Sequence, residues 1–339
     1  MNWFWIGLLA VFAGAAMQGS FALPQKYIRG WAWERMWLLY SVAGMIVFPW
    51  LLVTAVIPQA AAVYTQAGAG VLAQTALFGA GWGVGSVLFG LGIARVGMAL
   101  GFAIIISLTS ALGALVPMAV LHPQDLTSLR GGLLFLGLAL AILGVVFCSR
   151  AGALREAGPQ QRLSSSGAAF SRGLVICIAS GLTSPMLNLG FAFGDPIQVQ
   201  AVRQGADPAA ASIAIFAVAI SSGFLINAGY CLYLLGRNKS WRGAAPAQPL
   251  RNTLYAFAMG FLWLFGFFFY GLGATWLGKE FGPTLGWPIF MTVMVLVANF
   301  WGIATGEWKN ARARALRYLA TGILFMVAAL VVIASGMRT

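Results

Sequence analysis

Charged residues are scarce in this chain, and acidic residues are the scarcest. Only 8% of the 339 residues are charged, whereas a soluble domain carries about 25%. Seven Asp and Glu stand against twenty Lys and Arg. A chain with so little polar surface cannot cover itself in water, while 60% hydrophobic residues and a mean hydropathy of +0.88 suit a lipid bilayer. The sequence therefore predicts an integral membrane protein.

Patterns typical of catalysis and metal binding are also missing. The single histidine, His122, follows an apolar stretch, and the sequence has no HExxH motif and no pair of acids inside an apolar stretch. It also lacks a Ser and His pairing within these stretches and a glycine-rich phosphate loop ending in Lys. We therefore expect no enzyme activity, no cofactor and no metal.

Cysteine is rare as well. Cys148, Cys177 and Cys231 lie in or beside apolar stretches, without CxxC or metal-ligand spacing. We interpret them as small buried hydrophobic residues rather than disulfide partners. The first apolar stretch begins at Trp3 with no basic residue before it, so we expect no cleavage as a signal peptide.

Ten apolar stretches are long enough to cross a bilayer, which takes about 20 helical residues. A polar linker over 149–171 separates five stretches in 1–148 from five in 172–339. The predicted fold is therefore all-α, with ten transmembrane helices in two five-helix halves. The stretches are 3–23, 36–57, 72–94, 98–121, 130–148, 172–192, 210–235, 252–276, 285–305 and 316–335.

The third and eighth stretches resemble each other. A shift of 181 residues places 79–101 on 260–282 and aligns Trp82 with Trp263. Glycine is frequent in this chain, so the match depends mainly on the paired tryptophans and the FGLG and YGLG runs. Since each half has an odd number of spans, the two copies cross the membrane in opposite directions. This predicts two inverted five-helix repeats, an arrangement of secondary transporters.

The basic residues indicate an orientation. Sixteen of the twenty Lys and Arg lie in the loops that follow the odd-numbered stretches. Short basic loops stay in the cytoplasm, so both termini are expected on the outer side of the membrane. The positive net charge thus follows from topology and does not indicate a nucleic-acid partner.

Trp82 and Trp263 are the first candidate site residues. They lie near the middle of their stretches, whereas Trp is more usual at the membrane interface. A symmetry-related pair lining a central cavity would offer a sugar a flat face and N–H donors. The alternative is helix packing, in which neighbouring glycines admit a close helix.

Polar side chains inside apolar stretches are costly unless they have partners. Gln18 and Asn188 occupy comparable positions in the first stretch of each half, and we predict that they bind ligand hydroxyls. Ser86 and Tyr270 would add further hydroxyl groups. Their alternatives are a Ser that bonds its own helix and a Tyr that faces lipid.

The acidic residues all lie at span ends or in loops. A proton-coupled carrier usually keeps a titratable group near its site. Glu34, at the entrance to the second stretch, is the best candidate for proton coupling. The alternative is a solvated acid or one paired with Arg35.

Distinctive motifs are spread along the chain: WAWERMW (31–37), FGAGWGVGSVLFGLG (78–92), VGMALG (96–101), LINAGYC (225–231), FFFYGLG (267–273) and GEWKNA (306–311). Together they resemble the L-rhamnose–proton symporter family of the drug/metabolite transporter superfamily. The resemblance covers nearly the whole chain and implies ten helices in two inverted repeats. It further implies uptake of L-rhamnose with protons across a bacterial inner membrane, and it agrees with the periplasmic termini predicted from the basic loops. We therefore predict transport of L-rhamnose or a related deoxysugar by alternating access.

The chain also departs from that family. Where its members carry polar or histidine residues in the third, eighth and ninth spans, this sequence has Ser86, Gly266, Ala274 and Phe290. The depleted polar lining keeps two alternatives open. One is a drug/metabolite-type exporter or facilitator of another small metabolite, and the other is a membrane sugar sensor that binds without transport.

Overall fold

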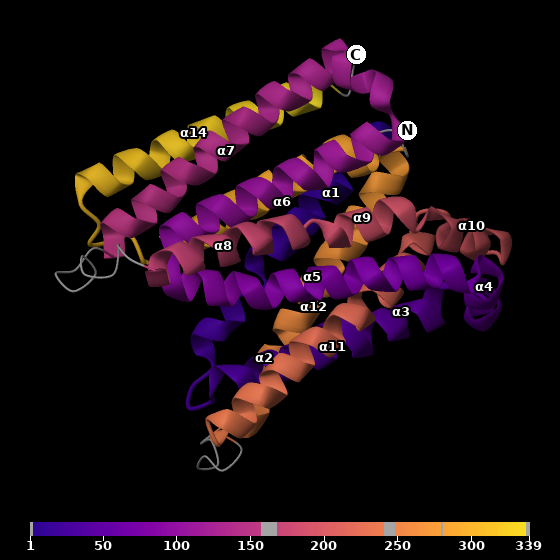
Figure 1. Cartoon of the computed structure of the whole chain (residues 1–339), viewed down its shortest axis with the longest axis horizontal. Helices are drawn as coiled ribbons and strands as arrows, with labels where there is room; N and C mark the ends of the chain where they lie inside the picture. The colour runs from indigo at the N-terminus through magenta and orange to yellow at the C-terminus, as the bar shows by residue number, and fades with distance from the viewer. Residues whose placement is uncertain (1–2, 157–167, 241–247, 279–280, 337–339) are drawn as a thin grey trace. The chain divides into compact units, whose positions relative to one another are not determined.

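The computed structural model describes residues 3–156, 168–240, 248–278 and 281–336 (Figure 1). All regular structure in these residues is helical, and ten segments are long and apolar enough to span a membrane, which confirms the predicted number. Their bounds are Trp3–Tyr27, Trp33–Val56, Ala69–Val96, Leu100–Leu121, Leu129–Arg155, Phe170–Arg203, Ala210–Arg237, Pro249–Leu277, Gly282–Ala304 and Ala313–Gly336. Of the linker expected over 149–171, residues 157–167 lie outside the described part.

Two of the spans consist of three helical segments each. The second combines α2 (Trp33–Ser41), the π-helical η2 (Val42–Val47) and α3 (Phe48–Val56). The sixth combines α8 (Ala168–Thr183), α9 (Met186–Phe193) and α10 (Asp195–Arg203). Ser184 and Pro185 form the turn between α8 and α9. Proline has no N–H and its ring clashes with the preceding turn, which is why the helix breaks there.

Met1–Val84 and Leu187–Gly278 form one compact unit. In addition to α2, η2, α3, α10 and nearly all of α9, it contains α1 (Trp3–Ser20), η1 (Leu23–Tyr27), α4 (Ala60–Ala67), the first part of α5 (Ala69–Val96), η5 (Ala210–Ser212), α11 (Ile213–Arg237) and α12 (Pro249–Leu277). We call it the first unit. The short α4 and α10 pack on each other, and sequence reasoning did not predict α4 as a separate helix.

Helices α1 and α12 of the first unit meet backbone to backbone. A Cβ atom at Gly14 would lie 2.5 Å from the Gly266 carbonyl oxygen, and one at Gly266 would lie 3.0 Å from the Gly14 carbonyl oxygen. No side chain fits between them, so both positions need glycine. Small residues permit this close approach of transmembrane helices.

Gly85–Met186 and Lys279–Thr339 form the second unit. It contains the rest of α5, α6 (Met98–Leu121), η3 (Pro123–Thr127), α7 (Leu129–Glu156), α8, η7 (Gly282–Gly286), α13 (Trp287–Ala304) and α14 (Ala313–Gly336). Helices α7 and α14 lie side by side and antiparallel along most of their length (Figure 1).

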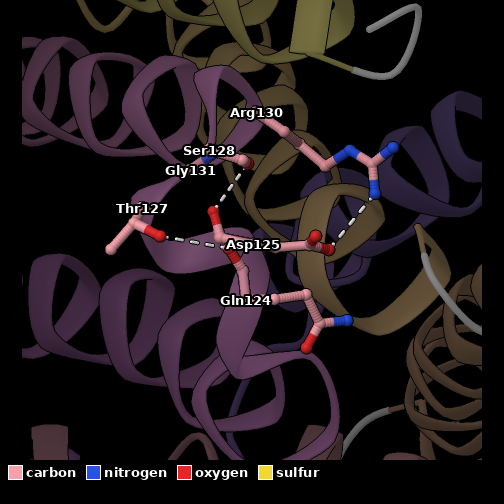
Figure 2. Close-up of polar contacts among 6 residues, drawn as sticks. All are labelled: Gln124, Asp125, Thr127, Ser128, Arg130 and Gly131. Carbon is pink, nitrogen blue, oxygen red and sulfur yellow. Dashed lines mark hydrogen bonds and ion pairs between the residues drawn. The ribbon is translucent and has the colours of Figure 1, made fainter.

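Polar contacts fix the turn between α6 and α7 (Figure 2). The Ser128 hydroxyl accepts from the Gly131 N–H at 3.2 Å and donates to the Asp125 carbonyl oxygen at 2.8 Å, so Ser128 caps the start of α7. The Asp125 carboxylate lies 3.2 Å from the Arg130 guanidinium. These contacts orient the long helix α7, whose other end lines the cavity described below.

Candidate functional site

Five of the six residues predicted to bind the substrate lie in the first unit. The structure brings them together as two groups: Gln18 with Trp82 and Trp263, and Asn188 with Tyr270. Ser86 is half-buried and belongs to the second unit. Beside it, the Ser180 hydroxyl of α8 donates to the Gly85 carbonyl oxygen at 2.8 Å.

Trp82 and Trp263, predicted as a symmetry-related pair, contact each other. Their ring centroids are 5.4 Å apart and their planes are inclined by 31°. Trp263 of α12 is 4% exposed, and Trp82 of α5 is half-buried. Gly223 of α11 packs on Trp82, since a Cβ atom there would lie 2.6 Å from the indole ring. The contact fits both interpretations of the pair, cavity lining and helix packing.

The Gln18 amide bonds Trp263 through both of its polar atoms. In the orientation that satisfies the amide, its oxygen accepts from Trp263 Nε1 at 3.1 Å and its nitrogen donates to the Trp263 carbonyl oxygen at 3.0 Å. The buried indole N–H thereby has the acceptor it needs. Gly266 makes room, because a Cβ atom there would lie 2.8 Å from the end of the Gln18 amide. The glycine at this position thus permits a close contact of α1 with α12.

Asn188 and Tyr270 form the second group. The Tyr270 hydroxyl donates to Asn188 Oδ1 at 2.6 Å, and both side chains are fully buried. Asn188 lies in the first turn of α9, directly after the break at Ser184 and Pro185. Tyr270 therefore does not face lipid, and the alternative interpretation of this residue was wrong.

Aromatic contacts connect the two groups. From Trp263 they run through Phe267, Phe216 and Phe191 to Tyr270, with centroid separations of 5.0, 5.8, 5.3 and 5.7 Å. All five side chains are buried and come from α9, α11 and α12. The predicted residues of the first unit thus belong to one packed aromatic cluster.

Glu34 lies in the first turn of α2 and is 6% exposed. Its Oε1 atom accepts from Asn238 Nδ2 at 3.1 Å and from the Ser240 hydroxyl. Both donors are neutral. The neighbouring Arg35 places its guanidinium carbon 4.8 Å from the centre of the Trp31 ring. The interpretation of Glu34 as a solvated acid was therefore wrong.

A ladder of aromatic rings joins α2 to the tryptophan pair. Trp33 stacks on Trp37 with centroids 5.0 Å apart, Trp37 contacts Tyr40 at 4.9 Å, and Tyr40 meets the edge of Trp263 at 6.1 Å. Trp37 Nε1 also donates to Asn227 Oδ1 of α11 at 3.4 Å. Sequence reasoning missed Trp37 and Tyr40, although spacings of four and three residues place three aromatic rings on one helix face.

The arrangement is suited to binding rather than to covalent chemistry. In the described ranges no three His, Cys, Asp or Glu side chains come close enough to hold a metal ion. Cys148, Cys177 and Cys231 are free thiols and are buried, as predicted. The candidate residues of the first unit offer aromatic faces, amides, the phenol of Tyr270 and the carboxylate of Glu34, which together can hold an uncharged polar molecule and a proton.

Comparison with known proteins gives a match over the entire chain. Residues 1–339 match the family described as L-rhamnose-proton symport protein. The chain is 30% identical over 341 residues to the L-rhamnose-proton symporter of Cronobacter sakazakii, and 28% identical to that of Mannheimia succiniciproducens. It is 27% identical to that of Citrobacter koseri. Each alignment covers 98% of both chains.

Proposed function

Because the chain belongs to the L-rhamnose-proton symport protein family, we propose that it carries L-rhamnose into the bacterial cell together with protons. It is a multi-pass inner-membrane transporter and not an enzyme. The observation that carries the proposal is the family match over all 339 residues, with ten spans at the predicted number. The proposal includes a related deoxysugar as the alternative substrate.

The proposed sugar site contains Gln18, Trp82, Ser86, Asn188, Trp263 and Tyr270. Indole faces would cover the apolar face of the sugar ring, while amide and hydroxyl groups would bond its hydroxyls. The Gln18 amide and the Trp263 N–H bond each other. Sugar hydroxyls would replace the hydrogen bond between the Gln18 amide and the Trp263 N–H. Both groups would keep a partner, so the free-energy cost of separating them would be low.

Glu34 is the proposed proton-coupling group. Two neutral side chains donate to its carboxylate, so protonation would neutralise the carboxylate without breaking an ion pair to either donor. A protonated carboxyl also loses acceptor capacity and gains a donor, which alters the contact of α2 with the end of α11. The ladder of aromatic rings from Trp33 to Trp263 forms a continuous series of packed contacts between α2, which carries Glu34, and the tryptophan pair.

Transport would proceed by alternating access between two inverted repeats, 1–148 and 172–339, with both termini in the periplasm. Support comes from the 181-residue repeat and from the basic loops. Each compact unit also combines segments from both halves of the sequence.

Uptake into proteoliposomes tests the proposed function. Labelled L-rhamnose should accumulate when the outside is more acidic than the lumen, and unlabelled L-rhamnose should compete. Uptake that only equilibrates would replace the symporter with a facilitator. Binding without any uptake would point to a sensor, and preferential competition by another solute would change the substrate.

A further inference from the structure

A cavity of about 180 Å³, with a mainly apolar lining into which a few polar groups project, lies within the second unit. It is lined by α6, α7, α13 and the segment that joins α13 to α14. Its apolar wall includes Phe102, Val145 and Val295. Its polar groups converge from three places in the sequence: Ser149 and Arg155 of α7, Asn299 of α13, and Glu307 and Trp308 after α13. None of them belongs to the sugar site proposed above.

A charge pair stands at the centre of these groups. Arg155 Nη1 lies 2.6 Å from Glu307 Oε2, and the Arg155 guanidinium lies over the Trp308 ring, 4.8 Å from its centroid. The two charged side chains remain 20% and 35% exposed. A guanidinium can donate about five hydrogen bonds and a carboxylate can accept about four, so both groups can serve a ligand as well as each other.

Asn299 adds a fixed acceptor. Its Nδ2 atom donates to the Val295 carbonyl oxygen at 2.9 Å, which holds the amide in place and leaves its oxygen for a ligand. Trp308 is 8% exposed and presents an indole to the same cavity. If the ion pair of Arg155 and Glu307 served only to tie α7 to the segment between α13 and α14, it would need no cavity beside it. It would also not need Asn299 as a further polar group in the lining.

We propose that this cavity is a second binding site for a neutral polyhydroxylated molecule of the size of a monosaccharide. The opposite charges of Arg155 and Glu307 cancel, so neither an anion nor a cation gains a net attraction there. A ligand that carries adjacent hydroxyl groups, however, can accept from the guanidinium and donate to the carboxylate and the Asn299 amide. The identification of the ligand with the transported sugar rests on the proposed function.

The charged residues of the cavity indicate its position in the membrane. Arg155 is the last residue of the fifth span and Glu307 follows the ninth, at the ends whose loops are predicted to be cytoplasmic from their basic residues. A sugar held here would therefore lie close to the cytoplasmic side of the membrane.

A thiol reagent can test the proposal at the cavity itself, since Cys148 is one of the residues that line it. We would keep Cys148 as the single thiol by replacing Cys177 and Cys231 with alanine, and measure its alkylation by N-ethylmaleimide in proteoliposomes. L-rhamnose and a panel of other neutral monosaccharides should slow the alkylation severalfold, and Asn299→Leu should abolish this protection. Phe300→Leu, on the exposed side of the same helix turn, is the matched control and should keep it.

Two results would overturn the proposal. One is an alkylation rate that no monosaccharide changes, obtained both with Cys148 and with a Ser149→Cys reporter on the same wall. The other is equal protection before and after Asn299→Leu, which would mean that sugar acts on the thiol by changing the conformation rather than by occupying the cavity. L-rhamnose uptake by the same single-thiol protein is measured in parallel. If uptake fails while protection persists, the proposed function falls and the cavity site stands.

Discussion

The hydroxyl of Tyr270 lies 2.6 Å from the amide oxygen of Asn188, and this contact joins α12 to α9 across 82 residues of sequence. Both side chains have no exposure to solvent or lipid. A buried polar group that loses its partner costs about 1–3 kcal/mol. The pair therefore holds the short helix after the Ser184–Pro185 break against the centre of the first unit.

Tyr270→Phe should lower the free energy of unfolding by about 1–3 kcal/mol, because it removes the donor to Asn188. Thermal unfolding in detergent would show the loss as a lower Tm. In a double-mutant cycle with Asn188→Ala, the two effects should combine to less than their sum. Tyr233→Phe, at an exposed tyrosine of α11, is the control and should leave Tm nearly unchanged. Additive effects in the cycle would show that the two residues do not act as a pair.

Trp82→Phe and Trp263→Phe test whether the tryptophan pair contacts the sugar. If it does, each variant should raise the L-rhamnose concentration needed for half-maximal uptake while insertion and folding persist. Trp263→Phe should also lower Tm, since it removes the donor to the Gln18 amide. Equal loss of folded protein in both variants, with unchanged uptake by what remains, would support the packing interpretation.

Glu34→Gln should separate sugar movement from proton movement. The amide keeps the shape of the carboxyl but cannot take up a proton, so exchange of L-rhamnose across the vesicle should persist while accumulation driven by a proton gradient is lost. Asp207→Asn removes the same charge at a loop residue that accepts from the N–H groups of Ala209 and Ala210. Accumulation should survive this control. Gradient-driven accumulation by Glu34→Gln would place the coupling group elsewhere.

Gly14→Ala should disrupt the contact of α1 with α12. The added methyl group would lie 2.5 Å from the Gly266 carbonyl oxygen, so the helices must separate. Overpacking of this kind typically costs about 1–3 kcal/mol. Gly229→Ala is the matched control within the first unit, because nothing lies within 4 Å of the added atom. A Tm for Gly14→Ala equal to that of the control would mean that the two helices are not packed this closely.

The orientation of the chain is open to direct measurement. Both termini are predicted to lie in the periplasm, on the side opposite the basic loops. A cysteine placed at either terminus should react with a membrane-impermeant thiol reagent added to intact spheroplasts. One placed in the loop after the fifth span should react only after the membrane is opened. The reverse pattern would overturn the predicted topology.

The number of spans could be read from the sequence because length and hydropathy alone determine it. The proximity of Trp82 and Trp263 was anticipated only as a symmetry relation; that their rings touch depends on how α5 and α12 cross. Likewise, the sequence predicted that Tyr270 supplies a hydroxyl group, but it did not predict that this hydroxyl bonds Asn188. Contacts between distant helices depend on packing angles, which a single sequence does not specify.

The burial of Glu34 shows a second limit. Its place at a span end suggested contact with water, yet Asn238 and Ser240, which follow α11, cover it. Neither residue lies near Glu34 in sequence or forms a recognisable motif with it. The aromatic ladder of α2, by contrast, could have been predicted, because its spacing is a local property of the helix.

The glycine contact between α1 and α12 has a mechanical consequence. Two backbones in direct contact attract mainly through dispersion, and a gap of about 0.5–1 Å already forfeits a quarter to a half of that attraction. Long, flexible side chains could follow a departing neighbour, but glycine has none that could do so. The backbone contact at Gly14 and Gly266 is therefore lost abruptly when the two helices separate, and the Gln18 amide bonded to Trp263 is the flexible group that still reaches across the junction.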